Sequence, residues 1–289
     1  MLMRPPRVAA IHDLSGFGRC SLTVILPVLS VMGIQVVPLT TALLSTHTGG
    51  FSNVVMEDLT GYIPKAVEQY RSQGIEFECV YTGFLGSDRQ IDIVHQFIDT
   101  FQSPNCLIAV DPVMGDHGKL YGTYTQSMQD GMGRLVNKAD VVMPNYTEAC
   151  FVLGDKYKED PLTDQEAKDM LLRLAERGPK QVVMTGLREG NDISVVSYDK
   201  DKNKFYKETH ALVPTLYHGT GDLYSSVLIG HLVLGKELPY AVAQASAFTL
   251  NSVIDAYHSK MPFHLGVPFE KYLSIINDFP LGNITCEEF

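Results

Sequence analysis

The chain has 289 residues, of which 45% are hydrophobic and 19% are charged, a composition typical of a globular protein with a full core. Its 23 basic and 33 acidic side chains give a formal net charge of −10. Such a charge disfavours sequence-independent nucleic-acid binding and binding to an anionic membrane surface, because both depend on clustered Lys and Arg.

The N-terminal segment, residues 1–7, is not followed by an apolar run of signal-peptide length. No run of about 18 apolar residues, the length that a membrane helix needs, occurs elsewhere. We therefore expect a cytoplasmic protein. The five cysteines are scattered and form no C-x-x-C pair, which indicates reduced thiols.

Short apolar runs alternate with amphipathic segments over most of the chain. The predicted strands are residues 8–12, 35–39, 79–82, 107–110, 141–143 and 182–184, and the predicted helices are 21–32, part of 54–73, 90–101, 127–136 and 165–177. This alternation predicts a three-layer α/β/α fold with a central, mostly parallel sheet.

The pattern changes after residue 184. Two strand-like runs, residues 193–198 and 204–210, flank a polar turn and predict a small β-hairpin. Two long helical stretches follow, at residues 221–234 and 239–258. The chain contains no repeat, low-complexity segment or long polar linker, so we expect residues 1–289 to form one domain.

Small, polar and glycine residues collect where the predicted strands end. These segments are residues 13–18, 40–41, 45–50, 82–86, 111–115, 144–148 and 185–186. Ligands of open α/β sheets bind outside the carboxyl ends of the strands. The sequence therefore predicts one binding site at this edge of the sheet.

The segment His218-Gly-Thr-Gly-Asp222 precedes a helical run and is the strongest motif. Backbone N–H groups at a helix N-terminus favour a phosphate, and Asp222 could accept a proton from a substrate hydroxyl. Alternatively, Thr220 or Asp222 only caps the helix and the glycines make a turn. The spacing leaves both interpretations open. No Walker A motif and no complete G-x-G-x-x-G are present.

Two further acidic positions have similar alternatives. Asp111 directly follows an apolar strand and could contact a metal–phosphate group, or it could only begin a turn before Pro112. Asn145 and Glu148 could face one site from a helix start, or they could form a capping box. No His, Cys and Asp cluster has zinc-ligand spacing.

Taken together, these segments resemble the ribokinase superfamily over nearly the whole chain. Within it, the vitamin-B6 branch of pyridoxal and pyridoxamine kinases is most similar. The segments that carry the resemblance are residues 45–49 (Ser-Thr-His-Thr-Gly), 82–87 (Thr-Gly-Phe-Leu-Gly-Ser), 111–115 (Asp-Pro-Val-Met-Gly), 144–148 (Pro-Asn-Tyr-Thr-Glu) and 219–222 (Gly-Thr-Gly-Asp).

The resemblance implies an ATP- and Mg²⁺-dependent kinase. Its substrate would be the 5′-hydroxymethyl group of pyridoxal, pyridoxamine or pyridoxine, phosphorylated in vitamin B6 salvage. Asp222 would be the general base, and the backbone N–H groups of Gly219, Thr220 and Gly221 would form an anion hole. A homodimer is also implied.

The resemblance assigns the remaining candidate residues to two groups. Asp111, Asn145 and Glu148 would organise Mg²⁺ and phosphates, with Asp111 and Glu148 holding the metal through water. Thr185 and Gly186 would contact the nucleotide. The substrate side would be lined by Asp13, Ser15, Thr46, His47, Thr48 and Phe84, and the ring of Phe84 would offer an aromatic wall to a pyridine.

Some features instead resemble the hydroxymethylpyrimidine kinases of thiamine synthesis. These are residues 13–18 and the His-Gly-Thr-Gly run at 218–221. Those kinases tend to carry Cys where this chain has Asp222, so Asp222 favours the pyridoxal branch. Thr185 stands where pyridoxal kinases often have a lysine. The alternatives are therefore a hydroxymethylpyrimidine kinase and a non-catalytic ligand-binding relative.

Overall fold

The computed structural model describes residues 4–122 and 124–289. Residues 1–3, part of the N-terminal segment considered in the sequence analysis, lie outside the described residues, as does Thr123. Within the two described ranges, no helix is both long enough and apolar enough to cross a membrane.

A ten-stranded sheet forms the centre of the fold, in the order β12-β11-β10-β9-β8-β5-β4-β1-β2-β3. The parallel strands are β1 (Arg7–Phe17), β2 (Gln35–Thr46), β4 (Cys79–Thr82), β5 (Leu107–Val110), β8 (Val141–Val142) and β9 (Gln181–Glu189). The antiparallel strands are β3 (Met56–Asp58), β10 (Asp192–Asp199), β11 (Lys204–Ala211) and β12 (Cys286–Glu288). The predicted hairpin is β10–β11 and belongs to this sheet. A second, small sheet pairs β6 (Gly115–Asp116) with β7 (Lys119–Leu120).

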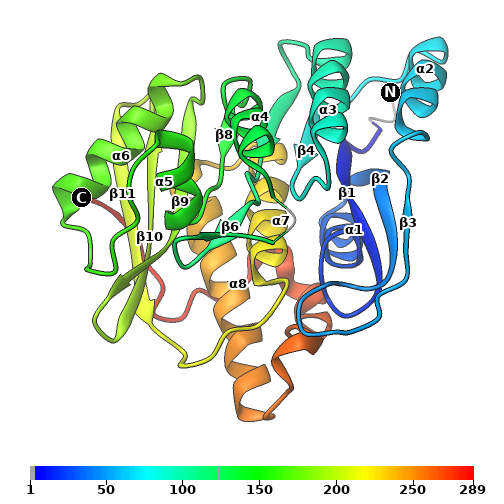
Figure 1. Cartoon of the computed structure of the whole chain (residues 1–289). Coiled ribbons are helices and arrows are strands. Elements are labelled where there is room, and N and C mark those ends of the chain that lie inside the picture. Colours follow the sequence, from blue (N-terminus) through cyan, green and yellow to red (C-terminus); the bar gives the residue numbers. More distant parts are fainter. Residues whose placement is uncertain (1–3, 123) are drawn as a thin grey trace.

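Helices cover both faces of the sheet (Figure 1). One face carries α1 (Leu22–Val31), α7 (Thr220–Val233) and α8 (Leu238–His258). The other carries α2 (Ile63–Ser72), α3 (Asp88–Phe101), α4 (Gln126–Val136), α5 (Tyr146–Leu153) and α6 (Asp164–Glu176). Two 3₁₀ helices follow α8, at Phe263–Leu265 and Glu270–Asp278. The predicted three-layer α/β/α architecture is confirmed.

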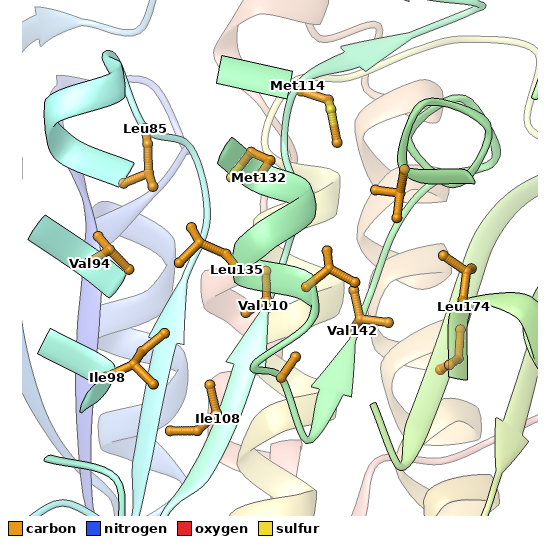
Figure 2. Packing of buried hydrophobic residues seen from close by; sticks show 14 of the residues in the cluster. Leu85, Val94, Ile98, Ile108, Val110, Met114, Met132, Leu135, Val142 and Leu174 are labelled. Carbon is orange, nitrogen blue, oxygen red and sulfur yellow. The ribbon is translucent and has the colours of Figure 1, made fainter. Parts of the chain in front are cut away.

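The burial of both sheet faces explains why the strands are continuous apolar runs. Along β1, Val8 and Ala10 pack into the layer of α1, α7 and α8, whereas Ala9 and Ile11 pack into the opposite layer. Successive side chains of a strand point to opposite faces, so both sets must be apolar when both faces are covered. Figure 2 shows the layer under α3, α4 and α6, where Val94, Leu135 and Leu174 meet the sheet.

Three strands extend well beyond their predicted ends. Strand β9 was predicted over residues 182–184 but continues to Glu189, so Thr185 and Gly186 lie within the strand and not after it. Residues 13–17 and 40–46 were expected to be loops, but they continue β1 and β2 and pair with each other, from Leu14 opposite Leu43 to Phe17 opposite Thr46. A register shift between His12 and Leu14 precedes this extension. Cross-strand pairing supplies hydrogen bonds that local composition does not reveal. Asp13 and Ser15 therefore stand on a strand and not in a loop.

Helix α6 provides a direct test of the core. Leu174 is fully buried, whereas Leu172 on the same helix is 36% exposed. We expect Leu174→Ala to lower the free energy of unfolding by about 2–5 kcal/mol, because it leaves a cavity. Leu172→Ala should cost less than about 1 kcal/mol. Urea unfolding followed by circular dichroism measures both, and equal losses would contradict this packing.

Candidate active site

Four carboxyl groups form a row at the carboxyl edge of the sheet. In order they are Asp13 in β1, Asp222 in α7, Asp111 after β5 and Glu148 in α5, and each neighbouring pair interacts electrostatically. We call this set the acidic row. Three members are buried and Asp222 is partly exposed. Within residues 4–122 and 124–289, none of the four forms an ion pair.

Burial and the charges of neighbouring carboxylates raise the pKa values of three members of the row. Desolvation, reinforced by the charge of Asp222, raises the pKa of Asp111 to about 7. Desolvation, together with the charge of Asp13, raises the pKa of Asp222 to about 6. The pKa of Glu148 is raised well above its usual range by burial and then by Asp111. Such shifts mark a site that a cation would stabilise.

Asp222 does not cap its own helix. The residue before α7 is Gly219, and no side-chain hydrogen bond caps the helix. Instead, Oδ2 of Asp222 accepts hydrogen bonds from the backbone N–H of Ser21 at 2.8 Å and from the thiol of Cys20 at 3.3 Å. The capping alternative therefore does not describe this residue, whose carboxylate faces the loop between β1 and α1.

The turn before α7 depends on a glycine at position 219. Its φ is +76°, and a Cβ atom there would overlap the carbonyl oxygen of Arg19. Gly221 differs, because no atom lies within 4 Å of the position of its missing Cβ. The hydroxyl of Thr220 donates to the carbonyl oxygen of Tyr217 at 3.2 Å. The first turn of α7 is thus held tightly on one side and open on the other.

Asp13 is fixed by two hydroxyl groups. Ser21 Oγ donates to its Oδ1 at 2.6 Å, and Ser15 Oγ donates to its Oδ2 at 2.8 Å. All three side chains are buried. Ser15 therefore orients Asp13 through a local bond, whereas Ser21 connects Asp13 to the neighbouring Asp222.

Asn145 and Glu148 form the predicted capping box of α5. Asn145 Oδ1 accepts from the Glu148 N–H, and Glu148 Oε2 accepts from the Asn145 N–H, both at 2.9 Å. Glu148 Oε1 also accepts from the N–H of Met114 at 3.1 Å. Each carboxylate oxygen of Glu148 thus accepts one backbone hydrogen bond and keeps a second lone pair for a water molecule or a metal ion. Thr185 forms an isolated β-bridge with Asn145, which brings Gly186 to the same place.

His47 uses both of its ring nitrogens within the protein. Nδ1 accepts from the N–H of Gly49 at 3.1 Å, so Nε2 carries the proton and donates to the carbonyl oxygen of His264 at 2.8 Å. The ring lies 5.1 Å from that of His218, beside the glycine turn. His47 can therefore meet a ligand with its ring face, but not with a free nitrogen.

The other predicted substrate residues have no bond to the acidic row among the described residues. Thr46 has a buried hydroxyl without a partner, and Thr48 is exposed. Phe84 is half-buried and packs against the ring of Tyr124 at 5.9 Å. The structure thus places these residues at the carboxyl edge without joining them to Asp13 or Asp222.

Four residues at this edge were missed by the sequence analysis. Cys20 and Ser21 contact Asp222, and Ser225 Oγ donates to Asp111 Oδ2 at 3.1 Å. Arg188 lines two adjoining hollows, one with Asn145 and Gly186, the other with residues 212–216. Arg188 could have been noticed because it follows a predicted strand end, but nothing local pointed to the other three.

Solved structures of similar proteins share this architecture. A Bacteroides thetaiotaomicron protein, described provisionally as a phosphomethylpyrimidine kinase and crystallised with pyridoxal, is 40% identical. The alignment covers 99% of this chain and 100% of that one, with a TM-score of 0.93. Pyridoxal kinase from Lactobacillus plantarum is 28% identical, covering 94% and 96% of the two chains with a TM-score of 0.86.

The fold and the acidic row beside the glycine turn define the class as the ribokinase-like small-molecule kinases. The chain belongs to the phosphomethylpyrimidine kinase family, whose profile matches residues 26–264. Among curated relatives, pyridoxal kinase from Dictyostelium discoideum is 28% identical over 249 residues, which is 79% of each chain. The predicted resemblance to the ribokinase superfamily and its pyridoxal kinase branch is confirmed.

The two glycines of the turn give a matched test of its geometry. We expect Gly219→Ala to lower the Tm by several degrees, because the added Cβ overlaps the Arg19 carbonyl at a positive φ. Gly221→Ala should leave the Tm unchanged or slightly higher, because its site is open and alanine favours a helix. Differential scanning fluorimetry without ligands measures both, and equal Tm values would contradict the close approach at Gly219.

Proposed function

We propose that this chain is a pyridoxal kinase, which transfers the γ-phosphoryl group of ATP to the 5′-hydroxymethyl group of a vitamin B6 compound. The observation that carries the proposal is the position of Asp222. Its Oδ2 is held by two donors, and its Oδ1 has no donor among the described residues, beside the open first turn of α7. The pyridoxal in the 40% identical relative supports the choice of substrate.

The carboxylate of Asp222 would accept the hydroxyl proton as the oxygen attacks phosphorus. With a pKa of about 6, Asp222 is mostly ionised at neutral pH and is basic enough to assist this transfer. The backbone N–H groups that open α7, at Thr220 and Gly221, have no acceptor within a preceding turn. They would stabilise the charge that grows on the transferred phosphoryl group.

Mg²⁺ and ATP fit the other half of the acidic row. Asp111 and Glu148 are buried carboxyl groups without a cationic partner among the described residues, and Asn145, Thr185 and Gly186 lie next to Glu148. No three His, Cys, Asp or Glu side chains of the described ranges converge as a metal-binding group. We therefore propose that Asp111 and Glu148 hold Mg²⁺ through water, and that Thr185 and Gly186 contact the nucleotide. When bound, Mg²⁺ would neutralise phosphate charge.

The substrate pocket belongs to the other end of the row. Asp13, held by Ser15 and Ser21, would contact the acceptor ring, together with Thr46, His47, Thr48 and Phe84. A second candidate, hydroxymethylpyrimidine kinase, is favoured by the family description. A relative of that name from Haemophilus influenzae is 29% identical over 170 residues. The two functions share Asp222 and differ in the acceptor ring.

Substitution of Asp222 tests the mechanism and the substrate together. We expect Asp222→Asn to lower kcat for pyridoxal by about 10²–10⁴ with a modest change in KM, because the base is lost and the shape is kept. Asp201→Asn, in the exposed β10–β11 turn, is the matched control and should behave as wild type. An ATP-coupled assay with pyridoxal, pyridoxamine and hydroxymethylpyrimidine identifies the acceptor. Turnover of the pyrimidine alone would contradict a pyridoxal kinase.

The pH dependence follows from the same carboxyl group. Asp222 acts only when ionised, so its own contribution to kcat/KM should be constant above its pKa of about 6 and fall toward tenfold per pH unit below it. Asp13 and Asp111 face the same group, and Asp111, with a pKa of about 7, also titrates in this range. In the pH profile of Asp222→Asn, the fall in kcat/KM caused by protonation of Asp222 should therefore be absent. Any fall caused by protonation of Asp111 should remain. An unchanged fall of kcat/KM at acid pH in that variant would contradict the assignment of Asp222 as the general base.

A further inference from the structure

The loop between β1 and α1 reaches the candidate base through two adjacent residues, Cys20 and Ser21. The thiol of Cys20 and the backbone N–H of Ser21 both donate to Oδ2 of Asp222, at 3.3 and 2.8 Å. The hydroxyl of Ser21 donates in the other direction, to Oδ1 of Asp13 at 2.6 Å. One short segment therefore holds two members of the acidic row, which stand 209 residues apart in the sequence.

The backbone of Ser21 is unusual for the place it occupies. Its φ and ψ are 52° and −133°, a conformation that residues other than glycine rarely adopt. Four other non-glycine residues of the described ranges have a positive φ, namely Asn53, His117, Asn203 and Lys260, and all four are exposed. Ser21 is only 5% exposed. A strained conformation at a buried position persists only where the surroundings over-determine it.

Contacts of the residues on both sides of Ser21 hold its backbone in this conformation. The carbonyl oxygen of Arg19 lies against Gly219, and its guanidinium binds Glu270 at 2.6 Å and the carbonyl oxygen of Leu265 at 3.2 Å. Thr23 Oγ1 accepts from the Cys20 N–H at 3.3 Å and donates to the Cys20 carbonyl oxygen at 2.7 Å. These contacts therefore hold the strained backbone of Ser21 in the conformation that directs its N–H group toward Asp222.

We propose that Cys20 and Ser21 are positioning residues for phosphoryl transfer. They hold Oδ2 of Asp222 so that Oδ1 alone faces the acceptor hydroxyl, and Ser21 sets Asp13 relative to that base. The proposal rests on the function proposed above, but only through Asp222 as the base, and holds for either acceptor ring.

Substitution of Cys20 separates positioning from packing. Cys20→Ala removes one donor to Oδ2, and we expect kcat to fall by about 3–10-fold with both KM values within about twofold of wild type. Cys20→Ser restores a donor and should return kcat to within about twofold of wild type. A role in packing alone predicts the reverse order, because a buried thiol behaves as a small apolar group that alanine replaces better than serine. That reverse order would overturn the proposal. Cys286→Ala and Cys286→Ser, in β12, are the matched controls.

Substitution of Ser21 tests the link to Asp13. Ser21→Ala keeps the N–H to Asp222 and loses the hydroxyl, so we expect the acceptor KM to rise about 3–10-fold and the KM for ATP to stay unchanged. Ser21→Gly loses the same hydroxyl but relieves the backbone, so its Tm should exceed that of Ser21→Ala, the reverse of the usual order. An unchanged acceptor KM, or a lower Tm for Ser21→Gly than for Ser21→Ala, would contradict the positioning role of Ser21.

A readout that needs no turnover tests the contact itself. Burial and the charge of Asp222 raise the pKa of the Cys20 thiol well above its usual range. At pH 8 the carboxylate is ionised, so Asp222→Asn should speed alkylation of Cys20 by iodoacetamide about threefold or more. Cys286 in the same sample, followed by peptide mass spectrometry, should react at an unchanged rate. Equal Cys20 rates in wild type and Asp222→Asn would overturn the proposal.

The outcomes for the two proposals are distinguishable. Absence of pyridoxal turnover with turnover of hydroxymethylpyrimidine would reject the pyridoxal kinase function, and the Cys20 and Ser21 series would then be measured with the pyrimidine. If neither acceptor is phosphorylated, the alkylation rates and the Tm order still decide whether the segment holds Asp222.

Discussion

The close approach of Arg19 to Gly219 is the contact on which the site depends. Because Gly219 has no Cβ, the carbonyl oxygen of Arg19 can lie against the start of α7. The β1–α1 loop therefore closes over the first turn of that helix, and Ser21 reaches Asp222. Without this approach, Ser21 would not reach Asp222, and Asp13 and Asp222 would have no shared partner.

The acidic row lowers the stability of the fold in a way that a bound ligand would compensate. Four carboxyl groups lie together without an ion pair among the described residues. Burial, followed by the charge of a neighbouring carboxylate, raises the pKa values of Asp111, Glu148 and Asp222. Burying like charges without compensation opposes folding. The arrangement is understandable if a cation and a phosphate complete the site. Without such a ligand, hydrogen bonds from hydroxyl and backbone donors, including those of Ser15, Ser21 and Ser225, keep the carboxylates in place.

The parts of the candidate site that could be predicted from the sequence are those formed by residues close together in the chain. The glycine turn before Asp222, the acid after β5 and the Asn145–Glu148 pair each depend on a few consecutive residues, and all lie at the predicted edge. The extension of β1 and β2 was not visible, because residues 13–17 pair with residues about 30 positions away. The contacts of Cys20 and Ser21 with Asp222 were hidden for the same reason.

The three-layer architecture, and the edge of the sheet at which the candidate site lies, could be predicted from the amino-acid sequence. Both follow from local periodicity and from the rule that parallel strands end together. In contrast, the turn of Asp222 away from its own helix toward Ser21, and the rise of its pKa to about 6, depend on the packing of the folded chain. Desolvation and long-range charge depend on which distant segments are packed together. No pattern in consecutive residues records that information.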